Sequence, residues 1–98
     1  QEHITLEGPT VARMRAALAD FAAAGIPVMV TEPDVSVLPR PRGFLDPDVS
    51  RRLAGDPALD PYREGLPDDV QARLADRYAE VFALYREFAP GLRRVTFW

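Results

Sequence analysis

Glu32 and Asp34 are the first side chains in this sequence whose type and spacing could do chemistry. They follow residues 26–31, an apolar run without alternation that predicts a strand buried on both faces, as in a parallel sheet. Active sites of α/β proteins are built where such strands end. Both carboxylates project to one side if the extended geometry continues, and their repulsion then requires a cation or hydrogen-bond donor between them. On spacing alone, a Glu32 that merely caps the following loop explains the pattern equally well.

His3 is the only histidine, and a lone histidine is more often a surface or packed residue than a catalytic one. With no second histidine, no cysteine and no metal-ligand spacing, we expect no metal site. Ser36 and Ser50 lie outside any nucleophile-elbow motif, which argues against a Ser-His-Asp hydrolase, and no glycine-rich phosphate loop is present. We expect no cofactor. Trp98, the only tryptophan, could fill a core or form a platform for a sugar ring, and core packing is the safer interpretation.

Two helices are predicted to support these residues. The first covers residues 9–24, with Pro9 at the first helical position, a stripe of apolar residues at spacings of three and four, and Gly25 as a left-handed terminator. The second covers residues 68–89, where Asp68 and Asp69 favour the N-terminus and an apolar stripe that includes Tyr78 and Tyr85 follows. On its opposite side, Arg77 and its charged neighbours predict a solvated face. Residues 94–98 read as a second strand.

Residues 33–67 contain seven of the ten prolines and predict a long packed loop, with one or two helical turns near residues 48–53. Two strands joined through a crossover helix form a βαβ unit, which would be right-handed. Two parallel strands cannot bury both faces alone, so further strands are needed. We therefore expect an α/β fold and an excerpt of a longer protein, cut at both ends, upstream of which a signal peptide could lie.

The composition excludes several classes of protein. The chain has 98 residues, 47% of them hydrophobic, a net charge of −3 and no cysteine. The hydrophobic content favours one packed domain or a piece of one. The mild acidity argues against a nucleic-acid partner, and no apolar stretch is long enough to span a membrane.

Five motifs in order resemble glycoside hydrolase family 10, the endo-β-1,4-xylanases. Residues 25–35 resemble its nucleophile strand, where an apolar run precedes Thr-Glu-Leu-Asp, and residues 1–3 resemble the Gln-x-His motif that ends the preceding strand. The other similar segments are residues 56–62 with 65–67, residues 71–72 with 77–78, and residues 94–98. The resemblance covers essentially the whole chain. It implies a partial catalytic domain over residues 1–98, a (β/α)₈ TIM barrel cut from the end of strand six through strand eight.

The resemblance also implies roles for individual residues. Glu32 would be the nucleophile of a retaining glycosidase. His3 would hydrogen-bond Glu32, and Asp34 would support that histidine. Gln1 and Trp98 would bind the reacting sugar, and the loop would frame the aglycone side of the cleft. It further implies a xylan or xylo-oligosaccharide substrate, secretion and a monomeric full-length enzyme.

Two departures from the family pattern matter. Pro33 stands where the family usually has leucine, and its fixed torsion could change the aim of Asp34. The general acid/base, which follows an asparagine on strand four of the family, is absent because this chain has no asparagine. We therefore expect the 98 residues to be inactive alone. The alternatives are a non-catalytic polysaccharide-binding remnant of the same fold, or a structural α/β domain whose resemblance is accidental.

Overall fold

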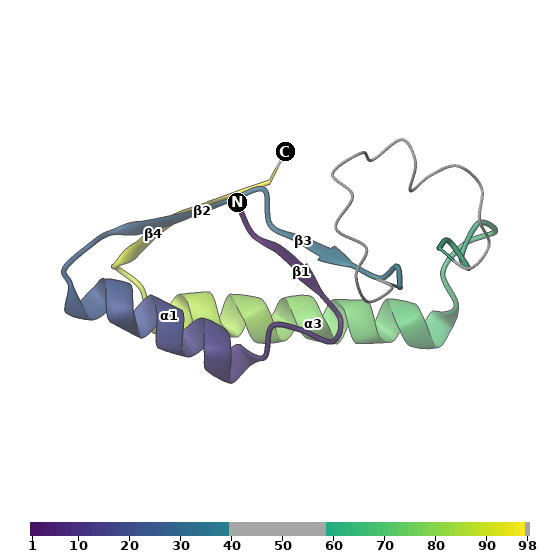
Figure 1. Ribbon diagram of the computed structural model, residues 1–98, viewed down its shortest axis with the longest axis horizontal. Coiled ribbons are helices and arrows are strands. Elements are labelled where there is room, and N and C mark those ends of the chain that lie inside the picture. The colour runs from purple at the N-terminus through teal and green to yellow at the C-terminus, as the bar shows by residue number, and fades with distance from the viewer. Residues whose placement is uncertain (40–58, 98) are drawn as a thin grey trace.

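The computed structural model describes residues 1–39 and 59–97 of the chain. Helices lie between parallel strands in the chain, which agrees with the predicted α/β class, and Figure 1 shows both helices on the same side of the strands. The described residues form no closed barrel. The elements in chain order are β1 (His3–Thr5), α1 (Val11–Ala23), β2 (Val28–Thr31), β3 (Asp34–Ser36), α3 (Asp68–Glu87) and β4 (Leu92–Thr96).

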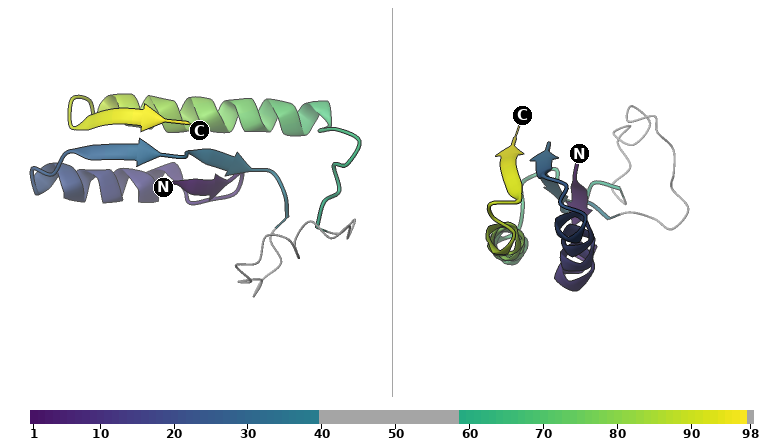
Figure 2. Two further views of the ribbon diagram at one scale, coloured as in Figure 1. Left: turned by 90° about the horizontal axis from the view of Figure 1, so that it is seen from above. Right: turned by 90° about the vertical axis from the view of Figure 1, so that its left-hand side faces the viewer.

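The strands form two parallel pairs that meet at one junction. β1 pairs with β3, with His3 opposite Asp34, and β2 pairs with β4. The backbone of Glu2 joins the pairs, because its N–H donates to Thr31 O at 3.1 Å and its carbonyl accepts from Asp34 N at 3.1 Å. Figure 2 (left) shows β2 and β3 end to end, with β4 on one side and β1 on the other. The predicted parallel βαβ arrangement is therefore present.

The junction between β2 and β3 is a change of backbone direction at Glu32. This residue has φ 55°, in the left-handed region that residues other than glycine seldom adopt. Pro33 follows and is buried. The condition that extended geometry continues from Glu32 to Asp34 is therefore not met, and the expectation that residues 34–36 belong to a loop is wrong.

Helix α1 begins two residues later than predicted. Thr10 is its N-cap, and the threonine hydroxyl accepts a hydrogen bond from Arg13 N at 3.3 Å. Pro9 consequently lies before the cap rather than at the first helical position. Gly25 has φ 68°, as predicted for the residue that terminates this helix.

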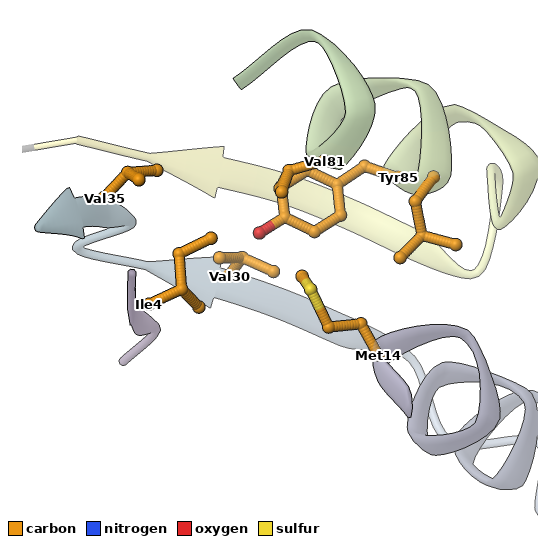
Figure 3. Packing of buried hydrophobic residues seen from close by; sticks show 7 residues of the cluster. Ile4, Met14, Val30, Val35, Val81 and Tyr85 are labelled. Atoms are coloured by element: carbon orange, nitrogen blue, oxygen red, sulfur yellow. The ribbon is translucent and has the colours of Figure 1, made fainter. Parts of the chain in front are cut away.

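Helix α3 contributes three of the seven residues of the buried apolar cluster from its inner side. Asp68 and Asp69 occupy its first turn as predicted, and the helix ends at Glu87, two residues early, with Phe88 as its C-cap. Figure 3 shows side chains of α3, α1 and three strands converging between the helices and the strands. The buried apolar cluster comprises Ile4, Met14, Val30, Val35, Val81, Leu84 and Tyr85.

Burial of β2 is one-sided, contrary to the prediction. Val30 is 6% exposed, whereas Met29 is 62% exposed. The physical reason is that α1 and α3 both lie on one face of the strands, as Figure 2 (right) shows. β4 begins at Leu92, two residues earlier than predicted. The helical turns predicted near residues 48–53, and Trp98, lie outside the described residues.

Arg77 was predicted on a solvated face, but it is only 7% exposed. Its guanidinium donates to the carbonyl oxygens of Thr5, at 3.4 Å, and Pro9, and it also contacts Glu80. Thr5 is the last residue of β1, and Pro9 lies in the turn between β1 and α1. A charged side chain can be buried here because backbone carbonyls and a carboxylate satisfy its donors.

Candidate active site

The Glu32 backbone is fixed at the end of the β2–β4 ladder. Its N–H donates to Thr96 O at 2.8 Å, one residue beyond the paired Thr31 and Thr96. The left-handed φ of Glu32 lies immediately after this bond. Backbone conformations of this kind cost free energy and concentrate at functional sites, where the surrounding structure enforces them.

Two side-chain pairs meet across the junction. Gln1 Nε2 donates to Glu32 Oε2 at 2.8 Å, and His3 Nδ1 lies in hydrogen-bond contact with Asp34 Oδ1. Gln1 and His3 are two residues apart, as are Glu32 and Asp34. Four of the five residues singled out from the sequence are therefore brought together, and Trp98 lies outside the described residues.

The pairing differs in one respect from the arrangement that the resemblance implied. His3 was expected to hydrogen-bond Glu32 with Asp34 supporting it. In the described part of the chain, His3 meets Asp34 as expected, but the donor to Glu32 is Gln1. Asp34 reaches His3 although Pro33 replaces the usual leucine, because Asp34 N is held by the carbonyl of Glu2.

The site is open to an incoming molecule. The side chains of His3 and Asp34 are 50% and 53% exposed. Asp34 holds the imidazole through Nδ1, so Nε2 is the ring nitrogen left to face other groups. Glu32 thus offers a carboxylate that is held by an amide at one oxygen, beside an imidazole that is held by a second carboxylate. In this arrangement the Glu32 carboxylate can attack an electrophilic carbon, while the neighbouring side chains hydrogen-bond hydroxyl groups of the same molecule.

Neither a metal centre nor a membrane span accompanies this site in the described ranges. Within residues 1–39 and 59–97, no three His, Cys, Asp or Glu side chains gather closely enough to hold a metal ion. The helices in these same ranges are too short or too polar to cross a membrane.

Sequence reasoning missed the polar contacts that support the site from the helix side. The Tyr85 hydroxyl donates to Glu2 Oε2, and the Tyr78 hydroxyl accepts from Val35 N at 3.3 Å. Both tyrosines were assigned only to the apolar stripe of α3. The available signal was alternation: Glu2 lies between Gln1 and His3, so its side chain points to the opposite face.

The whole chain is similar to one family of enzymes. The sequence profile of glycosyl hydrolase family 10 matches residues 1–98. Endo-1,4-beta-xylanase A of Xylanibacter ruminicola is 32% identical over 98 residues, and Endo-1,4-beta-xylanase of Geobacillus stearothermophilus is 30% identical over 98 residues. These matches include all of this chain but only 27% and 25% of the two relatives.

Solved structures agree with the sequence matches. A GH10 endoxylanase retrieved from a sugarcane soil metagenome superposes with a TM-score of 0.81 at 34% identity, and a Thermobacillus composti GH10 xylanase with 0.69 at 31%. All of this chain is covered in both cases, against 26% and 27% of those structures. The chain therefore spans about a quarter of the length of its relatives, and its fold corresponds to a fragment of a TIM barrel.

Proposed function

Because the chain belongs to glycosyl hydrolase family 10, we propose that the full-length protein is a retaining endo-1,4-β-xylanase that cleaves xylan or xylo-oligosaccharides. Glu32 is the nucleophile in this proposal: it attacks the anomeric carbon, the glycosidic bond breaks, and water later hydrolyses the covalent glycosyl-enzyme. The observation that supports the proposal is the Gln1–Glu32 hydrogen bond beside the His3–Asp34 contact, where the neighbouring parallel strands β1 and β3 begin.

The other site residues have supporting roles. Gln1 holds one oxygen of the Glu32 carboxylate, which leaves the other oxygen to attack. Asp34 fixes the rotation of the His3 ring, so that Nε2 can hydrogen-bond a sugar hydroxyl or Glu32. Gln1 and Trp98 bind the reacting sugar. The functional unit is a secreted monomer that needs no cofactor.

The 98 residues alone are inactive in this proposal. Retaining hydrolysis needs a second carboxyl group about 5–5.5 Å from the first, to protonate the departing oxygen and then activate water. We infer that this general acid/base belongs to another part of the full-length protein. A full-length protein that binds xylan without cleaving it would instead be the polysaccharide-binding remnant.

The test is Glu32→Ala in the full-length protein, assayed on an aryl β-xyloside with a good leaving group, with and without azide. The variant should lose activity. Azide should restore release of the leaving group and give the α-glycosyl azide as product, because the anion attacks from the face that the Glu32 carboxylate vacated. Glu87→Ala, on the exposed side of α3, is the matched control and should retain activity. Full activity of Glu32→Ala, or a β-glycosyl azide product, would contradict the assignment.

A further inference from the structure

Glu2 separates the two residues that hold the acidic side chains of the site, and its own side chain points the other way. Gln1 contacts Glu32 and His3 contacts Asp34, whereas Glu2 Oε2 accepts from the hydroxyl of Tyr85 on α3. The backbone of Glu2 also bonds Thr31 O and Asp34 N, each at 3.1 Å. One residue is thus bonded to β2, to β3 and to the helix beneath them.

Tyr85 is well placed to hold Glu2 still. It is 4% exposed, and its ring meets Phe82 edge-on with centroids 5.5 Å apart. Figure 3 shows its oxygen directed from α3 toward the strands. Burial, and to a lesser extent the hydrogen bond to Glu2, raises the pKa of Tyr85 above its usual range. The hydroxyl therefore stays protonated and can donate at working pH. A rigid buried donor bonded to a carboxylate makes a strong, directional contact.

From these contacts we propose that Glu2 and Tyr85 are positioning residues for the site: the Tyr85–Glu2 hydrogen bond fixes the tripeptide of residues 1–3, and so sets the aim of Gln1 at Glu32 and of His3 at Asp34. This inference rests on the proposed function. Neither residue touches substrate. Their effect passes through the strand backbone, where a small displacement of catalytic groups is costly.

The geometry limits the size of the effect. The Glu2 carboxylate lies on the wall of an open hollow of about 240 Å³ that Arg13 and Met14 also line. When the hydroxyl of Tyr85 is removed, water can reach the carboxylate and partly replace the lost donor. We therefore expect a moderate loss of rate rather than a loss of folding.

The test compares Tyr85→Phe, Glu2→Ala, Glu2→Gln and the double variant Tyr85→Phe/Glu2→Ala in the full-length protein, assayed well below the lowest Tm. Tyr85→Phe and Glu2→Ala should each lower kcat about three- to tenfold with KM unchanged. Glu2→Gln keeps an acceptor for the hydroxyl and should stay within about twofold of the parent. The double variant should lose no more than either single variant, because both remove the same contact.

Val81→Ala is the matched structural control, since Val81 is 2% exposed on the same helix and has no polar contact with Glu2. It should lower Tm and leave kcat unchanged. Any of four results would overturn the inference. These are an unchanged kcat in Tyr85→Phe and Glu2→Ala, a rise in KM that accounts for the loss of rate, additive losses in the double variant, and an equal loss of kcat in Val81→Ala.

Glu32→Ala is assayed in parallel, to separate a failure of this inference from a failure of the proposed function. If it is inactive while Tyr85→Phe is unaffected, only the positioning role fails; if it is fully active, the proposed function fails first.

Discussion

The two faces of the strands are held in different ways. On the helix side, Leu84 is fully buried and Val81 and Tyr85 are nearly so, and apolar contact holds α3 against the strands. On the opposite side, His3 and Asp34 are half exposed and are held by hydrogen bonds and by the backbone pairing of β1 with β3. Stability and chemistry are therefore assigned to different faces, and the Tyr85–Glu2 hydrogen bond joins the inner side of α3 to the tripeptide of residues 1–3.

Removing packing on the helix side alone is the strongest test of whether stability and activity depend on different faces. Leu84→Ala should lower the free energy of unfolding of the full-length protein by about 2–5 kcal/mol, because it deletes a fully buried side chain and leaves a cavity. Chemical denaturation measures this loss, and activity measured well below Tm should change little. Leu84→Met, which nearly conserves volume, is the control and should cost less than about 1.5 kcal/mol. A large loss of activity at low temperature would show that the faces are not independent.

The reverse change acts on the site face. Asp34→Asn should lower kcat by about tenfold to a hundredfold, because an amide cannot hold the His3 ring as the carboxylate does and a misaligned group is costly. The melting temperature should hardly move, since Asp34 is half exposed. Steady-state kinetics and thermal melting of the same preparation measure both quantities. A fall in Tm comparable to that of Leu84→Ala would contradict the division between the faces.

A change with a smaller expected effect tests whether the N-cap of α1 also contributes to the stability of the fold. Thr10→Ala removes the N-cap bond to Arg13 N and should cost about 1 kcal/mol. Thr10→Ser keeps the hydroxyl and serves as the control. Urea unfolding measures both variants, and equal losses would mean that the hydroxyl does not cap the helix.

The smallest effect is expected from the exposed pair that joins α1 to α3. Arg15 donates to Glu87 through Nε at 3.0 Å and through Nη2 at 2.8 Å. These hydrogen bonds, together with the positive charge of Arg15, lower the pKa of Glu87. Since the pKa is lower in the folded state, the contribution to stability is present above the unfolded-state pKa and is lost as pH falls through the folded-state pKa. In a double-mutant cycle of Arg15→Ala and Glu87→Gln, the coupling free energy should be below that of the Thr10 cap, and should shrink with added salt and in acid. A coupling free energy that is the same in acid as at neutral pH would contradict this.

Much of the fold could be predicted from the sequence, because it follows from local periodicity. The spacing of apolar residues located both helices within two residues at each end, and Gly25 marked the end of α1. β3 was missed because three residues in a proline-rich segment carry too little pattern to identify a strand. Arg77 was misplaced because its partners are the carbonyls of Thr5 and Pro9, about seventy positions away in the chain.

The site could be predicted only in part, and for a similar reason. Residue types and the family resemblance selected Gln1, His3, Glu32 and Asp34, which the structure does bring together. Which side chain pairs with which depends on the register of β1 against β3 and on the left-handed turn at Glu32. Sequence spacing fixes neither, and this explains why Gln1 rather than His3 holds Glu32.

Trapping the covalent intermediate shows directly whether Glu32 attacks the sugar. The full-length protein is treated with a 2-deoxy-2-fluoro xylobioside that bears a good leaving group, and its peptides are sequenced by mass spectrometry. We expect one fluoro-xylobiosyl group on the peptide that contains Glu32, attached to the Glu32 carboxylate. A label on any other carboxylate, with Glu32 unmodified, would contradict it.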